Sequence, residues 1–229
     1  MLRAVIFDVD GTIVDSVDLH AEAWTVAFEK FGKTRPFHEI RRQIGKGSDQ
    51  LLPVFLSKQE LDRFGEDLDD YRSQLFKKEY LPRVQGFARV RELFQRIKQD
   101  GKQIVLASSA KSDEIEAYKK IAQIDDLIES ETSSDDADKS KPYPDIFQAA
   151  LARLKDVAPE NAIVIGDTPY DAQAASKASL RTIGFLCGGW TEEELRSAGC
   201  MAIYRDAEDL LLHYDTQFGS PSASKTEVG

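Results

Sequence analysis

Two aspartates stand two residues apart, directly after a short apolar run near the N-terminus. The run Ala4-Val5-Ile6-Phe7 is β-branched and aromatic, which is typical of a buried strand, and Asp8 and Asp10 follow it. Side chains at i and i+2 of an extended segment point to the same side, so we expect the two carboxylates to share one site. Carboxylates about 5 to 7 Å apart repel each other, and a hard divalent cation such as Mg²⁺ usually offsets that repulsion. The alternative is an ordinary Asp-Gly turn.

Three further polar motifs lie where strands end or where stiff loops are expected. Ser108 follows the apolar run 103–107, and Lys141 lies in Ser-Lys-Pro-Tyr-Pro-Asp (140–145). Asp167 and Asp171 lie in Gly-Asp-Thr-Pro-Tyr-Asp (166–171). Singly, each has an ordinary interpretation: a helix cap, a solvated loop lysine, a turn residue and an exposed helix residue. Together they supply a nucleophilic carboxylate, a second carboxylate, a hydroxyl, an ammonium group and metal-binding oxygens, which is the inventory of phosphoryl transfer.

Strands that alternate with helices would position these groups. Further strands are predicted at 103–107, 127–128, 162–165, 181–185 and, more weakly, 201–204, with amphipathic helices between them. This alternation indicates an α/β fold, a doubly wound parallel sheet with helices on both faces. Ligands of such sheets bind at the carboxyl ends of the strands, where all four polar groups are expected.

A long segment between the first two motifs is predicted to be helical throughout. Apolar residues recur at helical spacing from Val17 to Phe31, with Ser16 as a possible N-cap, and the helix is expected to end near Gly32. Residues 36–80 also show helical stripes and no strand-like alternation. We therefore predict a core of residues 1–15 and 83–214, an inserted helical unit of residues 16–82, and a disordered tail at 215–229.

Composition narrows the possible functions. The 229 residues carry a formal net charge of −10, which disfavours a nucleic-acid surface. Two cysteines cannot build a disulfide framework or a zinc quartet. The sequence has no leader-like segment and no stretch near the roughly 20 apolar residues that span a bilayer, so a cytoplasmic protein without a membrane partner is expected.

The four motifs, in this order, resemble those of the haloacid dehalogenase superfamily of phosphatases. Asp-x-Asp-Gly-Thr, a strand ending in Ser, Lys-Pro-x-Pro and Gly-Asp-Thr-x-x-Asp match over residues 1 to about 214. The helical segment falls where that family carries a helical cap of the first type, as in phosphoglycolate phosphatases and β-phosphoglucomutases. The resemblance implies a Rossmann-like core with this cap inserted.

The resemblance also implies a role for each motif residue. Asp8 would be the nucleophile that forms an aspartyl-phosphate, and Asp10 the general acid and then the base. Mg²⁺ would bind Asp8, the main-chain carbonyl of Asp10 and Asp167, with Asp171 binding it directly or through water. The phosphoryl oxygens would be held by Ser108, Ser109 and Lys141 and by the turn at Gly11 and Thr12, partly through backbone N–H groups.

Two residues of the helical segment are candidates for substrate contact. Lys46 lies between Gly45 and Gly47, in a loop that could cover the site and meet a substrate anion, although a plain interhelical turn is the alternative. His20 lies one position off the apolar stripe of the first helix, whereas Trp24 lies on that stripe and is more typical of a core residue.

The activity expected from this resemblance is that of a Mg²⁺-dependent phosphatase acting on a small phosphorylated metabolite, such as a sugar phosphate. A phosphomutase of the β-phosphoglucomutase type is the alternative, because it would use the same two aspartates. A phospho-accepting signalling domain is a non-enzymatic alternative, but a base at Asp10 would shorten the life of the phosphate that such a switch needs. The sequence leaves the substrate and the oligomeric state open.

Overall fold

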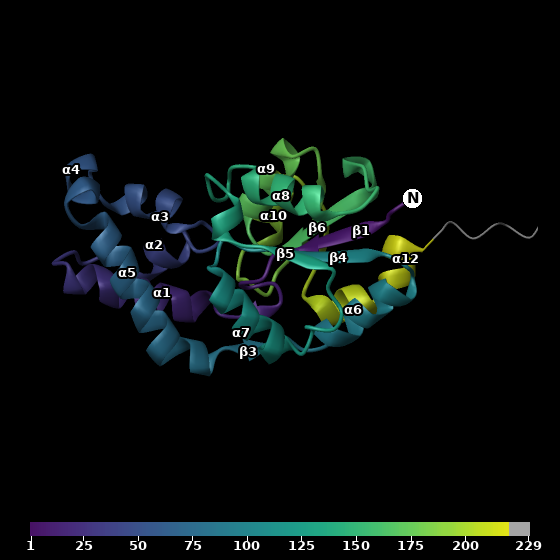
Figure 1. The fold of residues 1–229 in the computed structure, drawn as a ribbon, viewed down its shortest axis with the longest axis horizontal. Coiled ribbons are helices and arrows are strands. Elements are labelled where there is room, and N and C mark those ends of the chain that lie inside the picture. The colour runs from purple at the N-terminus through teal and green to yellow at the C-terminus, as the bar shows by residue number, and fades with distance from the viewer. Residues whose placement is uncertain (220–229) are drawn as a thin grey trace, which may run out of the picture.

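Six parallel strands form the centre of the molecule. The computed structural model describes residues 1–219, and its main sheet has the order β5-β4-β1-β6-β7-β8 (Figure 1). The strands are β1 (Ala4–Phe7), β4 (Gln103–Ala107), β5 (Ser130–Thr132), β6 (Ala162–Gly166), β7 (Arg181–Phe185) and β8 (Cys200–Tyr204). The predicted α/β fold with a parallel sheet is confirmed.

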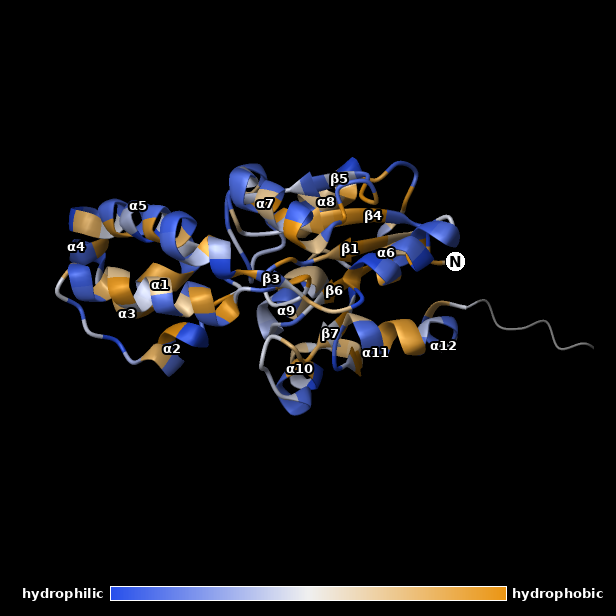
Figure 2. Cartoon of the chain, turned by 90° about the horizontal axis from the view of Figure 1, so that it is seen from below, coloured by the Kyte–Doolittle hydropathy of each residue, from blue (hydrophilic) through white to orange (hydrophobic). Residues whose placement is uncertain are grey.

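Apolar side chains of the strands alternate between two buried faces. Val5 and Phe7 of β1 pack on one face, whereas Ala4 and Ile6 pack on the other. The first face is covered by α6 (Val90–Gln99), α7 (Ser112–Ala122) and α11 (Ala207–Leu212), and the second by α8 (Asp145–Arg153) and α9 (Pro169–Lys177). Helix α10 (Glu192–Ala198) packs beside α9 and β8. Continuous apolar strands are what a sheet covered on both faces requires, and Figure 2 shows them as the hydrophobic centre of the core.

The helical insert (residues 17–83) lies to one side of the sheet (Figure 1). Its helices are α1 (Val17–Lys30), α2 (Phe37–Arg41), α3 (Ser48–Phe55), α4 (Lys58–Glu60) and α5 (Glu66–Leu75), with π-helical turns at Leu61–Gly65 and Phe76–Tyr80 and a 3₁₀ turn at Leu81–Arg83. These helices pack around an apolar cluster of their own, which includes Trp24, Phe28 and Leu51. The chain enters and leaves the insert through a two-stranded antiparallel pair, β2 (Val14–Asp15) and β3 (Gln85–Gly86).

Two local predictions were wrong. The strand expected at 127–128 is a turn, and β5 begins at Ser130 instead. The apolar Leu127 and Ile128 pack against the core cluster from this turn, so their hydrophobicity reflects burial rather than strand pairing. Ser16 makes no side-chain cap for α1, because its hydroxyl donates to the carboxylate of Asp10 at 2.6 Å.

The chain stays folded beyond the point where we expected the tail to begin. Helix α12 (Tyr214–Phe218) follows α11, and its Tyr214 is buried in the core cluster. The rest of the expected tail, residues 220–229, lies outside the described residues.

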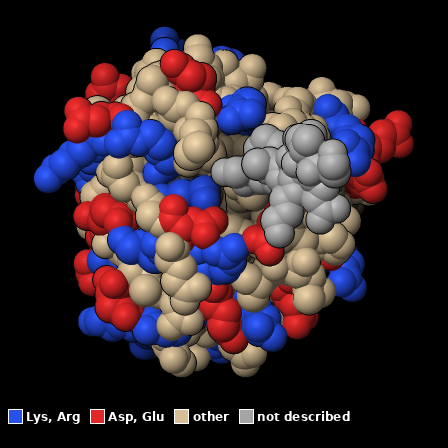
Figure 3. Space-filling view, turned by 90° about the vertical axis from the view of Figure 1, so that its right-hand side faces the viewer, with Lys and Arg blue, Asp and Glu red and all other residues tan. Residues whose placement is uncertain are grey.

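The face at the far end from the insert has a mixed charge. Figure 3 shows basic and acidic side chains interspersed over it. Helix α6 contributes ion pairs, such as those of Arg96 with Asp100 and Asp215. Within residues 1–219, no helix has the length and apolar character that a membrane crossing demands.

Candidate active site

The ends of three neighbouring strands bring the predicted residues together. Strands β4, β1 and β6 are adjacent, and Ser108, Asp8 and Asp167 directly follow them at the same edge of the sheet. Lys141 reaches this edge from the loop before α8, and Asp171 from the first turn of α9. All of these side chains are buried, with at most 3% of their surface exposed. The structure thus places four sequence-distant motifs in one site.

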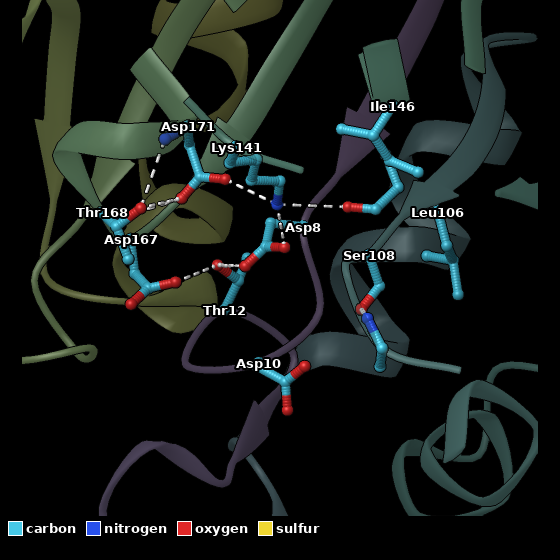
Figure 4. A network of polar contacts seen from close by, with 12 residues as sticks. Asp8, Asp10, Thr12, Leu106, Ser108, Lys141, Ile146, Asp167, Thr168 and Asp171 are labelled. Carbon is cyan, nitrogen blue, oxygen red and sulfur yellow. Dashed lines mark hydrogen bonds and ion pairs between the residues drawn. The ribbon is translucent and has the colours of Figure 1, made fainter. Parts of the chain in front are cut away.

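Lys141 occupies the centre of this group (Figure 4). Its Nζ donates to Asp8 Oδ1, forms an ion pair with Asp171 Oδ1 at 2.7 Å and lies 3.3 Å from the carbonyl oxygen of Ala107. Burial alone would lower the pKa of Lys141, but the two carboxylates outweigh it and raise this pKa. The ammonium group is therefore charged and fixed in position.

Three buried carboxylates lie close enough to share a cation. Oxygen atoms of Asp8, Asp167 and Asp171 all lie within 4.8 Å of one another. Burial, together with Asp171 and Asp10, raises the pKa of Asp8 to about 7 against the opposing effect of Lys141. Burial and the neighbouring carboxylates raise the pKa of Asp167 well above its usual range. Within residues 1–219, Asp167 Oδ2 is buried without a hydrogen-bond partner, so the donor set fits a hard divalent cation.

Asp171 is held more firmly than Asp167. It forms a capping box with Thr168 at the start of α9, in which the Thr168 hydroxyl donates to Asp171 Oδ2 at 2.7 Å. Its other oxygen pairs with Lys141. This carboxylate therefore fixes both the start of the helix and the lysine.

Asp10 points away from the three carboxylates, into a separate network. Its Oδ1 accepts from the Ser16 hydroxyl at 2.6 Å and lies 3.0 Å from His20 Nε2, which is also 3.0 Å from the Tyr118 hydroxyl. Burial opposes ionisation, but these neighbours outweigh it and hold the pKa of Asp10 below its usual value. The His20 ring stacks on Phe76 with 3.8 Å between ring centroids. His20, which we expected to contact the substrate, thus directs this nitrogen to Asp10.

The turn after β1 uses most of its polar groups internally. The Gly11 N–H donates to the Val14 carbonyl at 2.9 Å, and the Thr12 N–H lies 3.2 Å from the Val9 carbonyl. The Thr12 hydroxyl donates to Asp167 Oδ1 at 2.8 Å. Gly11 and Thr12 therefore shape the turn and orient a carboxylate, and in this structure they do not offer the free donors that we expected of them.

The two serines after β4 differ in their hydrogen bonding. Ser108 Oγ accepts from the Ala110 N–H at 3.0 Å and is fully buried. Ser109 Oγ is buried, has no partner among the described residues and belongs to a residue that lines the cavity above the site.

A cavity of about 270 Å³ separates the sheet edge from the helical insert. The insert contributes Trp24, Lys46 and Arg72 to its lining, and α7 contributes Glu114. Lys46 donates to Gln43 at 2.6 Å and lies 4.5 Å from the centre of the Tyr170 ring. Burial lowers the pKa of Lys46.

The loop that carries Lys46 lies directly against the core. Gly45 has a φ of +103°, and a Cβ added there would come within 2.8 Å of Thr168. The Gly47 N–H donates to Ser140 Oγ at 2.8 Å, and Asp49 accepts from Ser140 as well. The glycines permit this close approach, which brings the loop into the lining of the cavity that Asp8 also lines.

A second contact joins the insert to the core beside α9. The Arg42 guanidinium lies 3.6 Å from the centre of the Trp190 ring and pairs with Glu194 at 2.5 Å. The Tyr170 hydroxyl donates to the Arg42 carbonyl at 2.6 Å. Since Tyr170 lies between Asp167 and Asp171 in the chain, the insert docks on the same segment, the end of β6 and the start of α9, that carries two of the site carboxylates.

The sequence reasoning missed several residues of the site. Tyr118 and Arg72 are not among the site residues that we expected from the sequence. Glu114 lies one turn before Tyr118 on α7 and next to the apolar Ile115, so it falls at the edge of the buried face. A carboxylate at the edge of an otherwise apolar helix face was the available signal.

Comparison with known proteins agrees with this fold. The family model described as haloacid dehalogenase-like hydrolase matches residues 5–185. The chain therefore belongs to the haloacid dehalogenase-like hydrolases, as its motifs indicated.

Relatives and solved structures extend over nearly the whole chain. A phosphorylated carbohydrates phosphatase of Thermotoga maritima is 28% identical over 216 residues, which cover 91% of this chain and 97% of that protein. A pyrophosphatase PpaX of Bacillus thuringiensis is 24% identical over 181 residues, or 79% and 82% of the two chains. The solved structure of a hydrolase from Pseudomonas syringae has a TM-score of 0.86 at 27% identity and covers 95% of this chain and 100% of its own.

Proposed function

We propose that the protein is a Mg²⁺-dependent phosphatase that hydrolyses a small phosphorylated metabolite through a phosphoryl group carried on Asp8. The observation that carries this proposal is the arrangement around Lys141, whose ammonium group pairs with Asp8 and Asp171 beside a cavity that Asp8 helps to line. Family membership and a relative named as a phosphatase of phosphorylated carbohydrates support it.

In the first half of the reaction, a carboxylate oxygen of Asp8 attacks the phosphorus. A bond forms between that oxygen and phosphorus while the bond from phosphorus to the leaving oxygen breaks. Asp10 gives the leaving oxygen the proton that it took up from water in the preceding turnover, and the leaving group departs as an alcohol. Lys141, and donors after β4 such as Ser109, stabilise the negative charge on the phosphoryl oxygens.

In the second half, water replaces the protein as the acceptor. Asp10, now a carboxylate, takes a proton from the water whose oxygen attacks phosphorus, and the bond to Asp8 breaks to release phosphate. Ser16 and His20 favour the ionised form of Asp10 that this half requires. His20 is thus a positioning residue, because it acts through Asp10.

Mg²⁺ would be held by Asp8, Asp167 and the main-chain carbonyl of Asp10. When bound, it would neutralise charge on the carboxylates and on the phosphoryl oxygens. The unpartnered Asp167 Oδ2 is the atom that most directly fits such a ligand. Asp171 already accepts a hydrogen bond from Thr168 and forms an ion pair with Lys141, so its role would be to hold Lys141 and the start of α9 in position.

The test is phosphate release from an aryl phosphate and from a panel of small phosphate esters, measured with Mg²⁺ and with excess chelator. We expect release with Mg²⁺ and its loss with chelator. Transfer of phosphate within a sugar phosphate without release would indicate a phosphomutase instead. No turnover of any ester, together with a stable phosphorylated protein, would favour a signalling domain. A cytoplasmic location stays a prediction.

A further inference from the structure

Two buried polar atoms, one on the core and one on the helical insert, have no hydrogen-bond partner among residues 1–219. One is Oε1 of Glu114 on helix α7 of the core, and the other is Nε of Arg72 on helix α5 of the insert. Both residues line the cavity that opens onto Asp8. Leaving a buried polar atom without a hydrogen bond costs free energy, so native proteins rarely keep such atoms without a function.

Glu114 is an unusual residue to bury. Only 2% of its surface is exposed, although it lies on a helix whose neighbouring positions Asp113 and Glu116 are solvent-accessible. The charged groups around it come from four elements: His20 of α1, Arg72 of α5, Lys77 of the following π-helical turn and Asp10 after β1. Burial outweighs the three basic groups and raises the pKa of Glu114.

Arg72 is held in place on the insert side of the cavity by two contacts. Its guanidinium lies 4.7 Å from the centre of the Trp24 ring and pairs with Asp69 at 2.9 Å. Asp69 in turn accepts from the Ser48 hydroxyl at 2.8 Å. These contacts orient the guanidinium and leave its Nε–H free for a ligand.

We propose that Glu114 and Arg72 select substrates whose leaving group carries hydroxyls, that is, phosphate esters of sugars or polyols. This inference rests on the proposed phosphatase function and names the substrate class for it. A hydroxyl can donate to Glu114 Oε1 and accept from the Arg72 Nε–H, so one kind of group satisfies both atoms. An aryl or alkyl leaving group would satisfy neither.

Other leaving groups fit the pair less well. A second phosphate, as in pyrophosphate, could pair with Arg72, but the Glu114 carboxylate would repel it. An ammonium group could pair with Glu114, but Arg72 would repel it. A site built to bond a hydroxyl discriminates strongly against an analogue without one, because its own polar atoms are then left unpaired.

The test compares three probes with matched reacting groups. Ribose 5-phosphate carries hydroxyls, tetrahydrofurfuryl phosphate has a similar ring without them, and pyrophosphate presents a second phosphate. We expect kcat/KM of the native protein to be highest for ribose 5-phosphate, by about tenfold or more over each of the others.

The variant Glu114→Gln keeps the shape of the side chain and removes its charge. We expect kcat/KM for ribose 5-phosphate to fall about 10- to 100-fold, and the loss to be at least about tenfold larger than that for tetrahydrofurfuryl phosphate. Arg72→Met, which keeps much of the contact with Trp24, should show the same selective loss. Glu116→Gln is the control, since Glu116 lies on the same helix with half of its side chain exposed and should change neither value.

Thermal stability provides a second measurement. If Glu114 is retained for binding, Glu114→Gln should raise the melting temperature, because a neutral amide replaces a buried acid whose Oε1 has no hydrogen-bond partner among residues 1–219 and whose ionisation burial opposes. A residue kept for structure would give the opposite shift.

The outcomes separate the inference from the function on which it rests. Equal losses for ribose 5-phosphate and its hydroxyl-free analogue, or a native preference for pyrophosphate, would overturn the hydroxyl-binding role while leaving the phosphatase intact. A fall in melting temperature together with equal losses would make Glu114 a structural residue. Failure of the native protein to release phosphate from any probe would instead overturn the phosphatase itself.

Discussion

The two ends of the active-site cavity differ in what their buried polar groups contact. At the sheet edge, Lys141 lies among Asp8, Asp171 and a backbone carbonyl, so these charged groups are held by one another. The buried atoms there without a hydrogen-bond partner among residues 1–219 include Asp167 Oδ2 and Ser109 Oγ, which belong to the residues proposed for the metal and the phosphoryl group. At the end formed by the insert and α7, Arg72 Nε and Glu114 Oε1 have no partner among the described residues either. The sheet edge is therefore a charged network with places for a metal and a phosphoryl group, whereas the distal end leaves two atoms for the variable part of a substrate.

This difference separates the reaction from the choice of substrate. The phosphoryl group is the same in every substrate, so the groups that bind it can be fixed by the protein alone. The leaving group varies, and the residues proposed to contact it come from both the helical insert and α7 of the core. Changes at the sheet edge should therefore affect all substrates alike, and changes at the distal end should depend on the substrate.

The largest effect is expected from Asp8→Asn, which should abolish turnover of every ester. The amide has nearly the same size but cannot attack phosphorus. Loss of one buried carboxylate should also raise the melting temperature of the metal-free protein. Phosphate release and calorimetry check both effects, and repeated turnover by this variant would remove Asp8 as the nucleophile.

Asp10→Asn should cost about 10²- to 10⁴-fold in turnover, the usual contribution of general acid–base assistance. The loss should be greatest for esters with poor leaving groups, because these depend on the proton from Asp10. Phosphorylated protein should accumulate with an activated aryl phosphate, which mass spectrometry can detect. A loss below about tenfold with an alkyl ester would contradict this assignment.

Mg²⁺ should stabilise the fold through the sheet edge alone. The pKa of Asp8 is raised from 3.8 to about 7, so the folded protein binds more protons than the unfolded chain between these values. Without metal, stability should therefore fall as pH rises across this range. Mg²⁺ at a hundred times its dissociation constant should add about 2.7 kcal/mol to the free energy of unfolding. The resulting rise in melting temperature should be larger near pH 8 than near pH 6.

Melting curves with and without Mg²⁺ measure this shift. Asp167→Asn should weaken it, whereas Lys46→Ala, at the distal end, should keep it. An equal shift in the native protein and in Asp167→Asn would place the metal elsewhere.

The smallest effect should come from Lys46→Ala. If Lys46 contacts the leaving group, kcat/KM for a preferred sugar phosphate should fall about tenfold, with a clearly smaller fall for an aryl phosphate. Lys141→Ala should reduce both by the same large factor. Equal falls for the two substrates in Lys46→Ala would move that lysine into the general phosphoryl site, and no fall would leave it as a support for the loop over Tyr170.

Sequence predicted the sheet edge better than the distal end, for a physical reason. Asp8, Ser108 and Asp167 follow strands, and parallel strands that are neighbours must bring their carboxyl ends together. Once the strands were identified, the meeting of these side chains followed from topology.

The distal end has no such rule. Glu114 and Arg72 come from helices of different units, and their approach depends on how the insert docks on the core. Docking depends on particular contacts, such as Arg42 on Trp190, which spacing along the chain does not reveal. His20 was noticed from its position on α1, but its partner Asp10 could be identified only when the helix was placed.

The pairing of β2 with β3 has a consequence for how such proteins diversify. Val14 pairs with Gly86 and Asp15 with Gln85, so the chain departs from the core and returns to it at one point. Closing a loop whose ends already meet depends only weakly on its length, at about 0.6 kcal/mol per doubling. The intervening segment can thus change in length or be exchanged during evolution with little effect on the sheet. New substrate specificities can then arise by recombination at the β2–β3 pair, while the catalytic residues of the core are inherited unchanged.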